Sequence, residues 1–359
     1  MSVPSPTRNS KVDNVKAMLI FLVVFGHMIE TYIGNNHVLR SLWNLIYFIH
    51  MPMFALISGM FSKAELNSKT STSLIRQVAI PLLAFEIIYE LVEYALQGQL
   101  SVYASLFAPY WMLWYLLSLL CWRMLLPIFS RLQFPVWIAL LLAILASYSE
   151  HAGYFLSSSR TLVFFPYFVL GWQLGGDALK QPVPTVQKLI YGLLLLLGAG
   201  AIYQLPHDFD YRWLYGSYSL HRLEMANWHG SLYQLLQYLV SLTIGWSAIK
   251  LFAEKDWKLA QIGERSLYVL VWHGMALIGM QVSGALPWMF RQDAWLAFIL
   301  SVASSVLIVY LCTHDWCLRL TQKLLLQPLN WLLTRQEIAK PAALSNSWSG
   351  ELKNNKEGM

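Results

Sequence analysis

Long apolar runs constrain the fold of this chain more than any other feature of its sequence. Runs of about 17 to 25 residues, enough for a helix to cross a bilayer, recur along the 359 residues. Hydrophobic residues make up 57% of the chain and charged residues 12%, whereas a soluble domain carries roughly 25% charged residues. The sequence therefore predicts an all-α, polytopic integral membrane protein.

The apolar runs predict ten transmembrane helices. We place them at residues 15–35, 42–61, 74–97, 103–126, 134–149, 160–176, 186–205, 229–252, 266–285 and 294–314. With the N-terminus in the cytoplasm, the inner side carries 20 Lys and Arg residues and the outer side carries 5. Because basic residues favour the cytoplasmic side, we expect both termini inside and the protein in the cytoplasmic (inner) membrane. Residues 1–14 are then a cytoplasmic N-terminal segment, 15–320 the membrane domain and 321–359 a cytoplasmic tail, disordered at its end.

Several classes of site lack a signature in this sequence. Its three cysteines have neither a metal-binding spacing nor a disulfide pattern. A glycine-rich phosphate loop, a zinc signature and a Gly-x-Ser-x-Gly elbow are also missing. The basic excess lies mostly in short loops, which indicates membrane topology. We therefore expect no metal, no permanently bound cofactor and no nucleic-acid partner, and we expect contact with membrane lipids.

The first predicted membrane helix carries ionisable residues on one face. At about 100° per residue, Lys16 and His27 lie on the same stripe, about 16 Å apart along the axis. Asp13 and Glu30 fall within about 60° of that stripe. Ionisable groups inside a membrane helix are costly and mark pathways or sites. We therefore place the chemistry here, with Glu30, or a carboxylate of the third predicted span, orienting His27.

Histidines also lie in the second and ninth predicted spans. His50 and His273 are expected near the middle of the membrane, where they would share a polar cavity with His27. A hydrogen-bonded packing role for each is the alternative. Ser58-Gly59, near the predicted cytoplasmic end of the second span, permits close approach by a ligand. Helix packing through small residues explains this pair equally well.

The third predicted span carries Glu86, Glu90 and Glu93 on one face, at spacings i, i+4 and i+7. An unpaired carboxylate at mid-membrane is costly. We expect Glu86 and Glu90 to join the polar cavity as partners of the basic stripe on the first span. A purely structural buried pair is the alternative.

The long outer loop 206–228 mixes aromatic and charged side chains. Flat aromatic faces beside carboxylates and guanidinium groups suit a hydroxyl-rich ligand such as a sugar. An interfacial aromatic belt is the alternative interpretation. The residues that we expect to contact the acceptor are Asp208, Asp210, Arg212, Trp213, Tyr215 and Arg222.

These motifs resemble those of membrane acyltransferase family 3 and, within it, the fucose 4-O-acetylase-like acetyltransferases. The resemblance covers roughly residues 8–320. It rests on Asp13-Asn14-x-Lys16 with Val23-Val24-Phe25-Gly26-His27, His50-Met51-Pro52-Met53-Phe54 with Ser58-Gly59, Arg76 leading to Pro81, Trp114-Tyr115-Leu116, Phe165-Pro166-Tyr167-Phe168 with Gly171, and Ser266-Leu267-Tyr268 with His273.

The resemblance implies a ten-span enzyme that moves an acyl group, usually acetyl, from cytoplasmic acyl-CoA to a hydroxyl of an extracytoplasmic glycan or lipid-linked sugar. It implies that His27 is the catalytic histidine and that Lys16 and Arg76 belong to the acyl-CoA side. Ser58 and Gly59 are candidates for the same side. Position 16 departs from the more common arginine of the family, which replaces a bidentate phosphate fork by a point charge.

Two mechanisms and two other protein classes stay open at this point. Neutral His27 would take the proton of the attacking hydroxyl, or it would carry the acetyl group as a covalent intermediate. A transporter would use the same His and Glu residues as a proton relay, although no inverted repeat is visible. The chain would otherwise be a non-catalytic scaffold. A homo-oligomer or partners in an envelope-polysaccharide assembly are compatible with each reading.

Overall fold

The computed structural model describes residues 10–150, 153–206 and 208–333, and every regular element in this part of the chain is helical. The longer helices are α1 (Ser10–Ile29), α2 (His37–Met60), α4 (Ile80–Gln97), α6 (Trp114–Phe129), α7 (Pro135–Ser147), α8 (Ser158–Leu174), α9 (Thr185–Tyr203), α10 (Trp228–Phe252), α12 (Ser266–Val282) and α14 (Ala294–Thr313). Shorter helices are α3 (Ser68–Leu74), α5 (Val102–Ser105), α11 (Ala260–Glu264), α13 (Ala285–Met289) and α15 (Asp315–Thr321).

Six segments among the described residues are long and apolar enough to cross a membrane, namely those built on α1, α2, α6, α9, α10 and α14. Helices α7 and α12 are apolar but shorter. The all-α class is therefore confirmed. Each of the ten predicted ranges overlaps one of the longer helices, and ten crossings stay a prediction. The predicted segment 1–14 and tail 321–359 lie partly outside the described residues, which continue in helical turns as far as Leu332.

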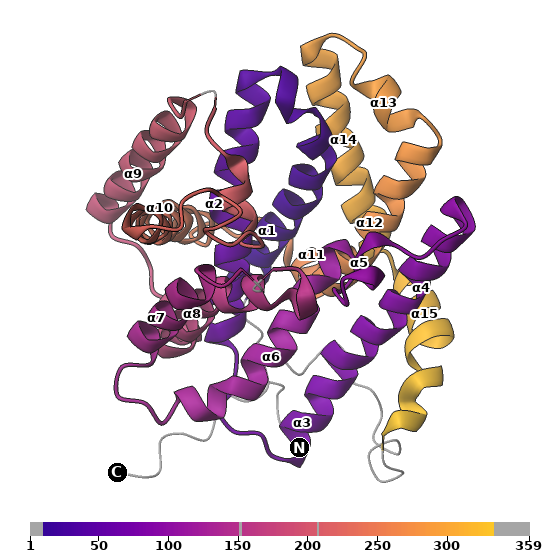
Figure 1. Cartoon of the computed structure of the whole chain (residues 1–359), viewed down its shortest axis with the longest axis horizontal. Helices are drawn as coiled ribbons and strands as arrows, with labels where there is room; N and C mark the ends of the chain where they lie inside the picture. The colour runs from indigo at the N-terminus through magenta and orange to yellow at the C-terminus, as the bar shows by residue number, and fades with distance from the viewer. Residues whose placement is uncertain (1–9, 151–152, 207, 334–359) are drawn as a thin grey trace.

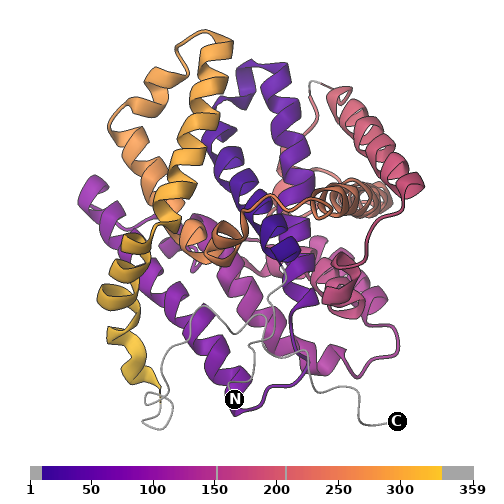
Figure 2. The ribbon, with the colours of Figure 1, turned by 180° about the vertical axis from the view of Figure 1, so that it is seen from behind.

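Helices α1 and α2 form the centre of the molecule and lie side by side in both views (Figures 1 and 2). Helices α11, α12 and α14 pack against α1 on one side, and α8 and α10 pack against α2 on the other. Helix α1 buries 13 of its 20 residues, on all of its faces. Helix α9 is equally apolar but buries only Ile202, as expected of a helix that faces lipid.

Two glycines bring α2 and α8 together backbone to backbone. A Cβ atom on Gly59 would overlap the carbonyl oxygen of Phe168, and one on Gly171 would overlap that of Leu56. Small residues permit this approach, which supports close packing between membrane helices. The packing interpretation of Gly59 therefore agrees with its position in the structure.

The fourth predicted span needs a correction, because residues 103–126 do not form one helix. Helix α5 ends at Ser105, and regular structure resumes with a short 3₁₀ turn at Trp111 that leads into α6. Between them the backbone takes positive φ values at Phe107 (50°) and again at Trp111 (33°). Such values are costly for residues with a side chain and persist only where the surroundings hold them.

Three glutamates of α4 hold the chain just before and just after α5. Glu86 accepts the backbone N–H of Tyr110 at 3.0 Å, and Glu93 accepts the Tyr110 hydroxyl at 2.9 Å. Glu90 accepts the backbone N–H and the hydroxyl of Ser101. Glu86 and Glu93 therefore position the turn that carries Trp111, and Glu90 holds the start of α5. The expected pairing of Glu86 and Glu90 with the first helix is wrong, because their partners are Tyr110 and Ser101.

Candidate active site

The end of α1 places His27 against Glu30. His27 lies in the last turn of α1, and Glu30 opens the 3₁₀ turn Glu30–Asn35, so both side chains point to the same side. His27 Nδ1 lies 2.9 Å from Glu30 Oε2, and the two side chains are only 14% and 23% exposed. Because an ionised carboxylate only accepts hydrogen bonds, Nδ1 is the donor in this contact, which leaves Nε2 as the basic nitrogen of a neutral imidazole. This is the arrangement of a histidine base oriented by an acid.

Glu30 is held by two tyrosines in addition to His27. The Tyr47 hydroxyl, from α2, donates to Oε2 at 3.0 Å. The Tyr215 hydroxyl, from the 3₁₀ turn Tyr211–Tyr215, donates to Oε1 at 2.5 Å. Hydrogen bonds to a charged acceptor are strong and fix its orientation. The carboxylate thus links α1, α2 and the loop that follows α9.

Aromatic rings fix the other side of the His27 imidazole. The ring stacks on His273 of α12, with centroids 5.5 Å apart and planes 24° apart, and meets Trp111 edge-on at 5.0 Å. His273 donates from Nδ1 to the carbonyl of Val269 at 2.9 Å, and its Nε2 contacts no partner among the described residues. His50 donates in the same way to Ile46 at 2.7 Å. Among the described residues, a carboxylate pairs with His27 but with neither His50 nor His273.

A cavity of about 180 Å³ lies next to His27 and Glu30; we call it the upper cavity. Its wall is rich in hydroxyl groups and aromatic faces and contains one guanidinium group. Of the residues predicted for a polar cavity, it includes His50. Other lining residues that bear on function are Tyr47, Tyr103, Trp111, Trp114, Arg160 and Tyr218.

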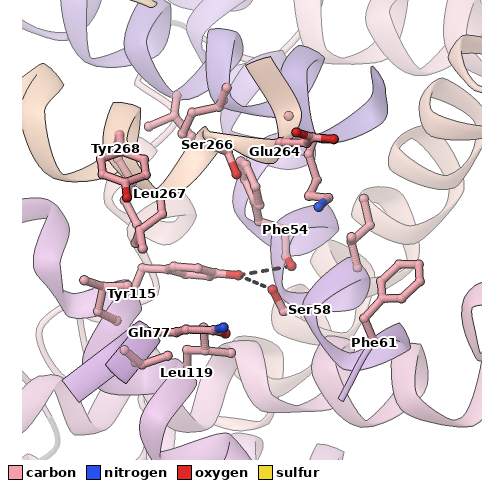
Figure 3. A pocket seen from close by; sticks show the side chains of 18 of the residues that line it. Phe54, Ser58, Phe61, Gln77, Tyr115, Leu119, Glu264, Ser266, Leu267 and Tyr268 are labelled. Atoms are coloured by element: carbon pink, nitrogen blue, oxygen red, sulfur yellow. Dashed lines mark hydrogen bonds between the residues drawn. The ribbon is translucent and has the colours of Figure 1, made fainter. Parts of the chain in front are cut away.

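A second cavity of about 130 Å³, the lower cavity, lies towards the Lys16 end of α1 (Figure 3). It brings together two residues predicted for the donor side, Lys16 and Ser58. Lys16 Nζ pairs with Asp13 at 2.8 Å, and an ammonium group has further protons to offer a ligand. Figure 3 shows the Tyr115 hydroxyl beside Phe54 and Ser58, where it lies 3.1 Å from the Phe54 carbonyl oxygen and 2.7 Å from Ser58 Oγ.

The two cavities share part of their lining. Val23, Met51, Tyr115 and Leu270 contribute to both, and we call these four side chains the shared wall. Val23 lies one helical turn before His27 on α1, so the wall and the histidine occupy the same face. One layer of side chains therefore separates the Lys16 side from the His27 side.

Other residues predicted for the donor side or the polar cavity lie elsewhere. Arg76 and Gly59 are absent from the lining of the described cavities, whereas Gln77 and Val78, which follow Arg76, line the lower one. Asp13 is buried, with its backbone against Gly263 of α11.

The predicted acceptor residues divide in the same way. Tyr215 lines the upper cavity, and Trp213, Asp208 and Arg222 do not. Asp210 accepts three hydrogen bonds from the Arg212 side chain, which hold the pKa of Asp210 below its usual range. This pair lies within the loop, where Arg212 also covers the Tyr218 ring at 5.5 Å.

Three residues of the site were not predicted from the sequence. Tyr47 lies one helical turn before His50, and this spacing was the available signal. Arg160 begins the sixth predicted span, where a cation at the edge of an apolar run is also a signal. Trp111 carries no such signal, because its position depends on the segment held by the α4 glutamates.

Comparison with protein families matches residues 9–314 to the acyltransferase domain of family 3. The nodulation protein NolL of Sinorhizobium fredii (strain NBRC 101917 / NGR234) is 30% identical over 135 residues, which cover 33% of this chain and 36% of that protein. NolL of Mesorhizobium japonicum (strain LMG 29417 / CECT 9101 / MAFF 303099) is 26% identical over 189 residues, covering 48% and 49%. The chain thus spans about half or less of the length of these curated relatives. No solved structure matches the chain.

Proposed function

Because the chain belongs to the family 3 acyltransferases, which are multi-pass membrane proteins, we propose that it is an O-acyltransferase that moves acetyl from acetyl-CoA to a carbohydrate hydroxyl. The observation that carries this proposal is the place of the His27–Glu30 pair. The pair lines the upper cavity, and the shared wall separates it from a lower cavity that contains Lys16.

The donor enters from the Lys16 end in this proposal. The rise from Lys16 to His27 is about 16 Å, a distance that an extended pantetheine arm can span. The nucleotide phosphates stay near Lys16 at the membrane edge, and the thioester comes to the shared wall. The enclosed position protects the thioester from water and strengthens the local electrostatic interactions.

The acceptor hydroxyl approaches through the upper cavity. His27 Nε2 takes its proton as the hydroxyl oxygen attacks the thioester carbon. The C–S bond breaks, the thiolate of CoA leaves, and the imidazolium returns the proton to it. Glu30 stabilises the imidazolium meanwhile. In a two-step version, His27 Nε2 attacks the thioester carbon, the C–S bond breaks and the CoA thiolate leaves. The acceptor oxygen then takes the acetyl group from acetyl-His27, which labelled acetyl-CoA offered without acceptor would trap.

A test starts from cells that lack the gene, because their surface glycan contains the unmodified acceptor. The full-length protein, purified in detergent, receives acetyl-CoA with and without this glycan, and free CoA thiol is followed. We expect thiol release that depends on the glycan, with acetyl gained by the glycan. A transporter or a scaffold would give neither, and that result would refute the proposal.

A further inference from the structure

Arg160 places a guanidinium group in the wall of the upper cavity, and none of the described carboxylates pairs with it. It is the third residue of α8, partly buried, and lines the cavity. Its Nε donates to the Tyr215 carbonyl at 3.2 Å and its Nη2 to Ser217 Oγ at 3.4 Å. Both acceptors are uncharged, and both contacts are long. A guanidinium has five N–H donors, so the remaining donors are available to a ligand.

Aromatic rings orient this group. The guanidinium carbon lies 5.2 Å from the ring centroid of Trp114 and 5.4 Å from that of Tyr154. Cation–π contacts of this kind stabilise the charge without neutralising it. The rings and the loop carbonyl thus hold Arg160 in place while its positive charge persists.

Glu30, the acid of the same cavity, does not serve as the missing counter-charge. Its oxygens accept from His27, Tyr47 and Tyr215, and Arg160 forms no ion pair with it. Partly buried charges are normally paired, and a cation that faces a cavity in a membrane protein marks a ligand pathway. The unpaired charge therefore indicates that the ligand supplies the anion.

We propose that Arg160, framed by Trp114 and Tyr154, binds an anionic group of the acceptor, so that the substrate is an acidic carbohydrate. The shared chemistry is a carboxylate or a phosphate, which a guanidinium can bind through two parallel hydrogen bonds. The tyrosines of the cavity wall, Tyr103, Tyr215 and Tyr218, offer hydroxyl partners and flat faces for the sugar ring. This inference rests on the proposed function and adds the charge of the substrate to it.

The first experiment identifies the acetylated sugar. Surface glycans from cells with and without the gene are compared by mass analysis and NMR. We expect the lost acetyl group on a sugar that carries a carboxylate or phosphate, or that is bonded directly to one. A neutral sugar between neutral neighbours would overturn this inference alone. An unchanged acetyl content would overturn the proposed function, and the inference with it.

The second experiment tests Arg160 with a two-by-two design. Wild type and Arg160→Gln are each assayed with the native acceptor and with an acceptor whose carboxyl groups are reduced to alcohols. We expect Arg160→Gln to raise the acceptor KM about 10- to 100-fold, with the acetyl-CoA KM unchanged. For a carboxylate ligand, reduction should raise the wild-type KM equally and add nothing in the variant. For a phosphate ligand, the same pattern should follow removal of phosphate with hydrofluoric acid.

Two further variants serve as controls. Arg160→Lys keeps the charge and should recover part of the acceptor affinity. Arg291→Gln removes an exposed arginine that does not line the upper cavity, and its acceptor KM should stay within about twofold of wild type. An Arg160→Gln enzyme that still distinguishes acidic from neutralised acceptors as wild type does would contradict the proposal. If Arg160→Gln raised the KM by the same factor for the native and for the neutralised acceptor, that result would also contradict the proposal.

Discussion

Glu30 receives hydrogen bonds from three separate segments, through His27 of α1, Tyr47 of α2 and Tyr215 of the turn Tyr211–Tyr215. A carboxylate satisfied in this way keeps the imidazole in one tautomer and one orientation. The position of Glu30 three residues after His27 makes this pair local, and for that reason the sequence predicted it. The two tyrosines come from distant segments, and no local pattern places them.

Replacing Glu30 by Gln tests the role of this carboxylate. The amide keeps the size of the side chain but removes the charge that stabilises the imidazolium. We expect kcat to fall about 10²- to 10⁴-fold with little change in either KM. Initial rates of CoA release measure this, with Glu65→Gln, an exposed change, as the control. A Glu30→Gln enzyme with more than about a third of wild-type kcat would contradict the assigned role.

A second prediction concerns Met51, because its side chain belongs to the shared wall where the thioester would lie. Met51→Ala should open space beside the acyl group and favour longer acyl chains. We expect the ratio of kcat/KM for butyryl-CoA to that for acetyl-CoA to rise about tenfold or more. Met51→Leu, which nearly conserves volume, should leave the ratio unchanged. An unchanged ratio in Met51→Ala would place the acyl group elsewhere.

The turn that ends at Gly216 shows how a single element positions several residues of the site. Gly216 has φ +65°, and a Cβ atom there would lie 2.9 Å from the Phe164 ring. Both the backbone conformation and the space therefore require glycine. This turn presents Tyr215 to Glu30 and its carbonyl to Arg160.

Gly216→Ala should displace Tyr215 from Glu30. We expect a fall in kcat of about tenfold, the scale of a lost hydrogen bond to a charged group. Gly192→Ala on α9 is the matched control, since its Cβ would meet nothing within 4 Å. Activity of Gly216→Ala equal to that of the control would show that this turn does not position the acid.

The helices themselves followed from the apolar runs, because length and hydrophobicity are local properties. The segment from Ser101 to α6 did not, since its path depends on Glu86, Glu90 and Glu93 from another helix. The sequence singled out these glutamates as costly in a membrane and assigned them the wrong partner. For the same reason, the sequence alone did not predict that His273 of α12 and Trp111 contact His27.

For the whole molecule, we predict that both termini lie in the cytoplasm. In that orientation the two cavities would connect a donor inside the cell with an acceptor outside it. We expect the loop at Asp208 outside and the loop at Lys255 inside; both residues are exposed. In a variant without native cysteines, an impermeant thiol reagent should modify Asp208→Cys in intact cells and Lys255→Cys only after permeabilisation. The opposite pattern would reverse the direction of transfer.

We expect His27 to perform the transfer at the shared wall. The most direct test compares purified wild type, His27→Ala and His229→Ala for acetyl transfer to the glycan from gene-deleted cells, with equal amounts of monodisperse protein. His229 is exposed at the start of α10, so its variant should retain full activity. We predict that His27→Ala transfers less than about 1% as fast as wild type. Transfer by His27→Ala at more than about 10% of the wild-type rate would contradict the account.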